Sequence, residues 1–199
     1  FEAAGHKVQL FHAPGETNDQ LFVWLPEKKA LFPGDNFYKT FPNLYTIRGT
    51  PYRDLVGWVN SIDLMRYLEP EYLVPSHTRP IVGKENINTL LTTYRDAIQF
   101  VHDQTVRLMN LGLDPNEIAE RLVLPKHLGD SPYLKEFYGT PEWSAKNVFS
   151  GYLGWFDGNP SSLKPLPLKD EAEKIIQLSG DWNSPVSYTH LTLPTNGTV

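Results

Sequence analysis

The chain has 199 residues, a formal net charge of -5 at pH 7, 40% hydrophobic residues and 21% charged residues. This length suits one good-sized domain or two small ones, and the composition is ordinary for a folded globular protein. The acidic balance gives no electrostatic reason to expect binding to nucleic acid or to an anionic membrane. Cysteine is absent, which excludes disulfide scaffolds and thiolate zinc sites, and no apolar run is long enough to span a membrane.

The first part of the chain alternates short strands with a helix. Residues 8–12, 20–25, 29–32 and 71–76 are short apolar and aromatic runs bounded by turn residues, which is typical of strands. Residues 52–68 predict an amphipathic helix, because their apolar side chains recur every three or four positions. Strands that alternate with a helix indicate an α/β layer.

The pattern becomes helical after residue 83. An apolar stripe predicts a long helix over residues 87–108, which Gly112 ends. The sequence Asp-Pro-Asn-Glu at residues 114–117 then signals another helix, with an N-cap, a proline at the first position and a glutamate that closes a capping box. Residues 143–155 predict a third helix. This part contains no cluster of potential metal ligands, so we interpret it as a packing and assembly region.

The end of the chain differs from the rest in composition and in hydrophobic pattern. Asp170 is predicted to cap a last short helix that ends at Gly180. Residues 184–199 have little charge and no helical period, and the run SYTHLTLPTN resembles a translated read-through of sequencing-adaptor DNA. We therefore expect residues 184–199 to be a non-native tail and assign no function to its histidine or to its glycosylation sequon.

Three potential metal ligands stand at the ends of neighbouring predicted strands. Glu16 precedes the second strand, Asp35 follows the third, and His77 follows the fourth. Side chains at such strand ends project into the crevice beyond the sheet, where ligands collect. Two carboxylates placed together repel each other unless a dication lies between them, and oxygen and nitrogen donors suit Zn²⁺ or Mn²⁺. These three residues therefore predict a metal site.

A cationic loop follows Asp35. Lys39, Arg48 and Arg53 bring three positive charges into one short segment. The planar guanidinium group presents a fork of donors that matches tetrahedral oxyanions such as sulfate or phosphate. A metal site beside two arginines favours the hydrolysis of an anionic ester.

Each of these residues also has a simpler interpretation. Glu16 could be a solvated loop acid, Asp35 a turn former, and His77 a strand-end histidine bonded to the backbone. Arg48 and Arg53 could pair with carboxylates on the surface.

Several segments together carry a family resemblance. The order of strands, with PGET before the second and FPGD after the third, resembles the second half of a metallo-β-lactamase domain, although that superfamily usually has a histidine where Glu16 stands. The segments NLYTIRG, SHTRP, YRDAIQFVHDQTVRLMN, EFYGTPEWS and GYLGWFDGNP more specifically resemble the alkyl sulfatase branch. The resemblance extends from about residue 8 to residue 180.

The resemblance implies an α/β fold in two parts. Residues 1–83 would form the C-terminal half of the metallo-β-lactamase αββα sandwich, and residues 84–183 an all-α dimerisation domain. The complete enzyme would be a homodimer that hydrolyses alkyl sulfate esters such as dodecyl sulfate to alcohol and sulfate. It would hold two Zn²⁺, which lower the pKa of bound water.

The same resemblance assigns roles to individual residues. Glu16, Asp35 and His77 match the carboxylate ligand, the bridging carboxylate and the late histidine ligand of the family. Arg48 lies in NLYTIRG, which lines the sulfate pocket of the family, and it joins Asp35 as a candidate catalytic residue. Arg48, Arg53 and, in the same loop, Asn43 are the candidate substrate-binding residues.

The family's H-x-H-x-D-H motif matches none of the six histidines. We expect it upstream of residue 1, so this chain alone would be inactive or nearly so. The compartment stays open between secreted or periplasmic and cytoplasmic. Two alternatives also stay open. One is another hydrolase activity on this scaffold, such as a lactonase or phosphoesterase. The other is a pure dimerisation module, because half a sandwich leaves a sheet edge and an apolar face uncovered.

Overall fold

The structure is a computed structural model that describes residues 1–180. Its contacts divide the chain into two compact units, Phe1–Trp155 and Phe156–Val199. Among the described residues no helix is both long enough and apolar enough to cross a membrane. The predicted non-native tail, residues 184–199, lies outside the described residues.

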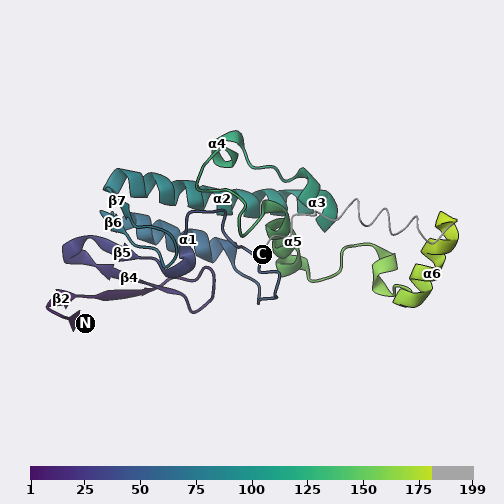
Figure 1. The fold of residues 1–199 in the computed structure, drawn as a ribbon, viewed down its shortest axis with the longest axis horizontal. Coiled ribbons are helices and arrows are strands. Elements are labelled where there is room, and N and C mark those ends of the chain that lie inside the picture. Colours follow the sequence, from purple (N-terminus) through teal and green to yellow (C-terminus); the bar gives the residue numbers. More distant parts are fainter. Residues whose placement is uncertain (181–199) are drawn as a thin grey trace. The chain divides into compact units, whose positions relative to one another are not determined.

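A five-stranded sheet forms one layer of the first unit (Figure 1). Neighbouring strands are antiparallel except for the parallel pair β5 and β6, which a helical crossover connects. A separate ribbon pairs β1 (Glu2–Ala3) with β2 (His6–Lys7). The strands of the sheet, in spatial order, are β3 (Gln9–His12), β4 (Leu21–Leu25), β5 (Ala30–Phe32), β6 (Tyr72–Leu73) and β7 (Ile81–Val82).

The four predicted strands are confirmed as β3 to β6, each somewhat shorter than expected. The connection between β4 and β5 is a short 3-10 helix, η1 (Pro26–Lys28), followed by Lys29 in the left-handed region at φ 46°. The sequence did not predict β7. Two residues between a proline and a glycine are too few to show the period of two that marks a strand.

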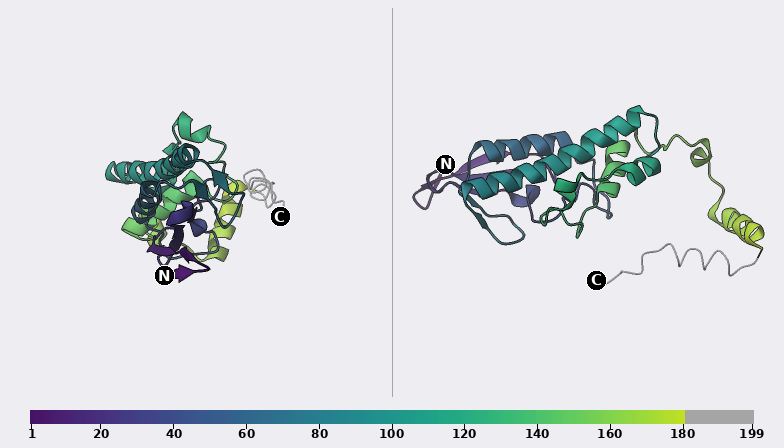
Figure 2. Two further views of the ribbon diagram at one scale, coloured as in Figure 1. Left: turned by 90° about the vertical axis from the view of Figure 1, so that its left-hand side faces the viewer. Right: turned by 90° about the horizontal axis from the view of Figure 1, so that it is seen from above.

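Two helices cover one face of this sheet and lie side by side (Figures 1 and 2). The first, α1 (Leu55–Tyr67), begins at Asp54, whose side chain accepts a hydrogen bond from the backbone N–H of Val56 at 3.0 Å. The second, α2 (Lys84–Asn110), ends just before Gly112, as predicted. Both predicted helices are therefore confirmed, with bounds that differ by a few residues.

Three shorter helices complete the first unit: α3 (Pro115–Arg121), α4 (Lys126–Gly129) and α5 (Pro141–Leu153). The predicted capping box is present, because Asp114 accepts from two backbone N–H groups and Glu117 accepts from the N–H of Asp114 at 3.1 Å. The helix predicted at residues 143–155 begins two residues earlier, capped by Thr140. It ends at Gly154, whose φ of 82° few other residues adopt.

The described part of the second unit contains η3 (Pro160–Leu163) and α6 (Leu168–Ser179). Gly180 ends α6 in the left-handed conformation, as the sequence predicts. The prediction that Asp170 caps this helix is wrong. Pro167 occupies the cap position. Asp170 lies in the first turn, where its negative charge interacts favourably with the positive end of the helix dipole.

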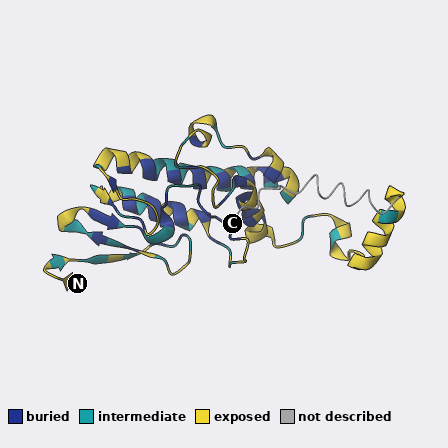
Figure 3. Cartoon of the chain, viewed as in Figure 1, coloured by how far each residue is buried: buried dark blue, intermediate teal, exposed yellow. Residues whose placement is uncertain are grey.

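The core of the first unit lies between the sheet and the helices (Figure 3). Side chains alternate along each strand, so the buried Phe22, Trp24, Leu31, Leu73 and Ile81 all face the helices. The opposite face is also apolar but exposed, because it carries Leu10, Leu21, Tyr72 and Val82 with 45–62% of their surface accessible. Strands that are apolar on both faces are typical of a sheet covered on both sides.

The helices α1 and α2 share this core, so the contacts place residues 1–83 in one compact unit with those that follow. The predicted domain boundary between residues 83 and 84 stays a prediction.

We expect the substitution Ile98→Ala to destabilise the first unit strongly. Ile98 is fully buried in the stripe of α2, and truncation removes burial and leaves a cavity, at a cost of about 2–5 kcal/mol. Urea denaturation measures the change in free energy of unfolding. The control is Thr89→Ala on the exposed side of α2, expected to change it by less than about 0.5 kcal/mol. Equal losses in both variants would contradict this account of the core.

Candidate functional site

Five of the six predicted site residues line one pocket. The pocket has a volume of ≈ 590 Å³ and opens at the ends of the strands. Its walls include all three predicted metal ligands, Glu16, Asp35 and His77, and both predicted arginines, Arg48 and Arg53. The topology thus brings together side chains that lie up to 61 positions apart in the sequence.

The turn that carries Glu16 is held by a buried amide. The side chain of Asn36 donates to the carbonyl of Ala13 at 2.6 Å and accepts from the N–H of Glu16 at 3.1 Å. The backbone carbonyl of Asn36 accepts from the indole N–H of Trp58 in α1 at 3.0 Å. A side chain at Gly15 would meet Asn36 Oδ1 at 2.1 Å, so only glycine permits this approach. Asn36 follows Asp35 in the 3-10 helix η2 (Gly34–Asn36). By holding the turn of Glu16, Asn36 therefore fixes Glu16 near Asp35.

Glu16 forms a buried ion pair with Arg53. The distance between Glu16 Oε1 and the Arg53 guanidinium is 3.1 Å, and the two side chains are 13% and 5% exposed. Burial raises the pKa of the Glu16 carboxyl, Arg53 opposes that rise, and the charge of Asp35 adds to it. Arg53 also donates to the backbone carbonyl of Asn43. The alternative that Arg53 pairs with a carboxylate on the surface is therefore wrong.

Asp35 and His77 face each other across the pocket. His77 Nε2 lies 3.6 Å from Asp35 Oδ1, a buried atom without a hydrogen-bond partner among the described residues. A buried acceptor without a donor, next to an imidazole nitrogen, fits two ligands of a cation. Glu16 is engaged by Arg53, however, and within residues 1–180 no three His, Asp or Glu side chains are arranged to hold a metal. The three-ligand set stays a prediction.

The two remaining candidates, Arg48 and Asn43, lie in different surroundings. Arg48 is exposed and lines the pocket, and it forms no ion pair with a carboxylate of the described chain. Asn43 is 3% exposed and lies behind the pocket wall. Its backbone N–H donates to the hydroxyl of Tyr38 at 2.6 Å, and its carbonyl accepts from Arg53. Asn43 thus stabilises the pocket wall through its backbone hydrogen bonds. Its predicted contact with a substrate stays a prediction.

Sequence reasoning missed two tyrosines of this pocket, Tyr38 and Tyr138. Burial raises the pKa of the Tyr38 hydroxyl far above its usual range, so this group stays protonated. Tyr138 comes from the helical half of the chain, and its ring centroid lies 6.3 Å from that of Tyr38. The segment EFYGTPEWS was part of the family resemblance, but nothing local in it points to a pocket near residue 16.

We expect Arg53→Met to make stability depend more steeply on pH. Without Arg53 the pKa of Glu16 rises further, because its carboxylate loses the opposing charge. A raised folded-state pKa does not lower the free energy of unfolding while the carboxyl is protonated in both the folded and the unfolded state. The loss grows as the pH rises above the unfolded-state pKa, and it is complete once the pH has passed the folded-state pKa. Urea unfolding at about pH 4 and about pH 7 should therefore show a larger loss at the higher pH.

The matched control is the double substitution Glu16→Gln with Arg53→Met, which removes the titrating group. It should lose stability equally at both pH values. A pH-independent loss in the single variant would contradict the buried pair.

The chain matches two family models in succession. The model of the metallo-beta-lactamase superfamily matches residues 1–77, and the model of alkyl sulfatase dimerisation matches residues 114–190. Among curated proteins, the chain is 44% identical over 179 residues to a linear primary-alkylsulfatase of Pseudomonas sp., covering 89% of this chain and 34% of that protein. It is 36% identical over 172 residues to the alkyl/aryl-sulfatase BDS1 of Saccharomyces cerevisiae, covering 84% and 27%.

Solved structures agree with these matches. The stereoselective inverting sec-alkylsulfatase Pisa1 from Pseudomonas sp. superposes with a TM-score of 0.88 at 28% identity, covering 96% of this chain and 31% of that one. A metallo-beta-lactamase family protein from Thermus thermophilus superposes with a TM-score of 0.50 at 19% identity, covering 77% and 46%, which is a likeness of fold.

The fold and the strand-end pocket define a protein of the metallo-β-lactamase superfamily, with mixed α/β structure and a helical region of the dimerisation type. Within that superfamily, the chain belongs to the alkyl sulfatase family. The predicted family and fold class are thereby confirmed. The chain spans 34% and 27% of the lengths of the two curated relatives described above.

Proposed function

We propose that this chain is part of an enzyme that hydrolyses alkyl sulfate esters to an alcohol and sulfate. The observation that carries the proposal is the meeting of two kinds of group in one pocket. Asp35 and His77 supply oxygen and nitrogen donors, and Arg48 supplies a guanidinium group that forms no ion pair with a described carboxylate. The names of the curated relatives, which are alkylsulfatases, support sulfate esters over other anionic esters.

Arg48 is the group best placed to receive the sulfate. Its fork of donors matches a tetrahedral oxyanion, and its exposure leaves those donors open to a ligand. Arg53 differs, because its charge is already paired with Glu16. Arg53 therefore holds the Glu16 side of the pocket, and Arg48 carries the positive charge that a sulfate ester would meet.

The residues present fit part of a zinc site. Asp35 with its unpartnered oxygen and His77 beside it would hold a Zn²⁺ ion, and Glu16 would join them on release from Arg53. In the complete enzyme two such ions would supply Lewis-acid activation of water. Within this chain, the carboxylates of Glu16 and Asp35 provide negative charge that favours a dication. Arg53 reduces that negative charge because it pairs with Glu16.

We further propose that the complete enzyme is a homodimer that pairs through its helical region. The match to the alkyl sulfatase dimerisation model supports this proposal. On α5, Tyr152 and Leu153 are 54% and 60% exposed, so apolar surface is available for association.

Zinc content tests the incomplete ligand set. We expect the purified 199-residue chain to retain clearly fewer than two zinc ions per chain, because three potential ligands cannot fill two tetrahedral sites. Elemental analysis after dialysis against zinc-free buffer measures the ratio. His77→Ala should lower any zinc that remains, whereas the control His127→Ala should not. Two tightly bound ions per chain would contradict the proposal.

Activity tests the proposed reaction in a longer protein that joins this chain to an upstream region bearing the H-x-H-x-D-H motif. We expect sulfate release from dodecyl sulfate, and we expect Arg48→Gln to lower kcat/KM about a hundredfold or more, as loss of a charge-stabilising donor does. Arg121→Gln, an exposed arginine on α3, is the control and should leave the rate unchanged. The 199-residue chain alone should be inactive.

Two results would redirect the proposal. Hydrolysis of aryl phosphates or lactones without sulfate release from any sulfate ester would support another hydrolase on the same scaffold. Association without zinc or sulfate binding would support the pure dimerisation module.

A further inference from the structure

The segment that carries Arg48 is supported from behind by the helical region. Residues 44–52 have no helix or strand, and Arg48 lies at a tight turn in which the N–H of Gly49 donates to the carbonyl of Thr46 at 3.0 Å. The tip of this loop is exposed at Ile47, Arg48 and Gly49. The hydroxyl of Thr46 also donates to the carbonyl of Gly49 at 3.1 Å, so these two bonds close the turn of the backbone, while its position relative to the pocket depends on contacts outside the tip.

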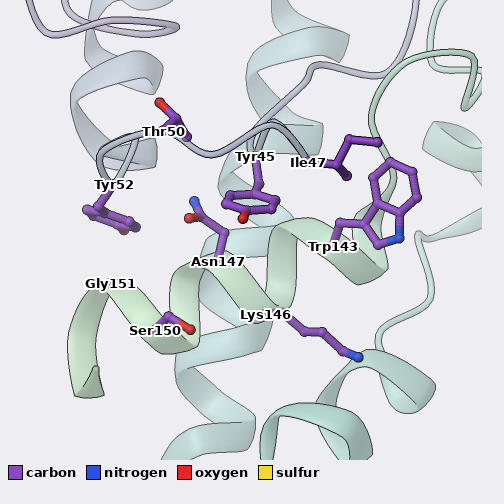
Figure 4. Close-up of a pocket in the computed structure, with 9 residues that line it drawn as sticks. All are labelled: Tyr45, Ile47, Thr50, Tyr52, Trp143, Lys146, Asn147, Ser150 and Gly151. Atoms are coloured by element: carbon purple, nitrogen blue, oxygen red, sulfur yellow. The ribbon is translucent and has the colours of Figure 1, made fainter. Parts of the chain in front are cut away.

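A second pocket of ≈ 460 Å³ separates this loop from α5 (Figure 4). Ile47 and Trp143 lie at one end of it, and Tyr52 and Gly151 at the other. Because this space lies between the loop and α5, the loop is not packed on the helix along its whole length. The contacts that do cross from α5 to the loop therefore contribute to its position.

Asn147 makes the central crossing contact. Its side chain extends from α5 toward the loop (Figure 4). Its Nδ2 donates to the backbone carbonyl of Leu44 at 3.0 Å. Asn147 is 8% exposed and Leu44 is fully buried, so water competes little for this bond. The two residues are 103 positions apart in the sequence.

Other close contacts hold the two ends of the segment. A side chain at Gly151 would meet the ring of Tyr52 at 2.3 Å, so the helix and the ring are in direct contact. On the other side, the N–H of Phe41 donates to the carbonyl of Lys135 at 2.9 Å. The loop is thus attached to the helical region just before its start and at its end, and Asn147 holds it at Leu44, three residues before the exposed tip.

We infer that Asn147 is a positioning residue for the anion site: it holds the loop so that Arg48 lies in the pocket with Asp35 and His77. The inference rests on the proposed function and extends it. Residue 147 lies within the match to the dimerisation model, and residue 48 within the match to the superfamily model. The helical region would therefore be part of the catalytic architecture and not an attachment for pairing alone.

Sulfate binding to the 199-residue chain tests this inference, with inorganic sulfate as the probe and titration calorimetry as the measurement. Asn147→Leu removes the donor at nearly constant volume. We expect it to weaken sulfate binding about three- to tenfold, the equivalent of one buried hydrogen bond. Asn147→Gln keeps an amide donor, and the adjacent pocket has room for its extra methylene. Its affinity should lie closer to that of the unsubstituted chain.

The matched control is Ser144→Ala, one turn earlier on α5. Ser144 is 1% exposed, and its hydroxyl donates at 2.6 Å to the carbonyl of Thr140 within the helix's own first turn. This control also loses a buried hydrogen bond of α5 but leaves the loop untouched. Its sulfate affinity should equal that of the unsubstituted chain even if its free energy of unfolding falls.

Hydrogen exchange at the loop amides gives a second readout, and it should accelerate in the Asn147 variant alone. If Asn147→Leu does not fold, Asn147→Ser, with a shorter donor, replaces it with the same expected direction. Equal sulfate affinities for the Asn147 and Ser144 variants would overturn the inference and leave the proposed function standing. If the unsubstituted chain binds no sulfate, or Arg48→Gln binds it equally well, both would fail.

Discussion

The candidate site depends on one buried amide. Asn36 ties the turn before Glu16 to the end of β5, and its backbone accepts the indole N–H of the fully buried Trp58 in α1. A buried amide needs hydrogen-bond partners for both its N–H donor and its carbonyl acceptor, so these bonds restrict the Asn36 side chain to one orientation. It places Glu16 near Asp35, where burial first and then the charge of Asp35 raise the pKa of Glu16, so that a counter-charge is needed to keep it ionised.

The need for a counter-charge to Glu16 gives the two arginines different roles. Arg53 is buried and neutralises Glu16, whereas Arg48 stays exposed at the mouth of the same pocket. The ion pair with Glu16 and the carbonyl of Asn43 offset part of the cost of burying Arg53, whose Nε has no hydrogen-bond partner among the described residues. The pocket therefore combines a buried, paired cation with an open one. This division suits a site in which an anionic ester approaches carboxylates without being repelled.

The helical region contributes to this pocket and to the loop beside it. Tyr138 contributes to its wall, and Asn147 bonds to the loop that carries Arg48. On the sheet itself, one face is covered by α1 and α2 while Leu10 and Val82 remain exposed on the other. The described residues thus bring five candidate site residues together in one pocket and leave apolar side chains exposed on one face of the sheet.

Local signals in the amino-acid sequence were enough to predict several elements. The capping box at Asp114, the stripe of α2 and the strand ends that carry Glu16 and His77 depend on neighbours within a few residues. Which charges meet became visible in the folded chain alone, because an ion pair between positions 16 and 53, or a hydrogen bond between 44 and 147, leaves no periodic trace in the sequence. Burial then set the pKa and the role of each group, and burial is a property of the packed molecule.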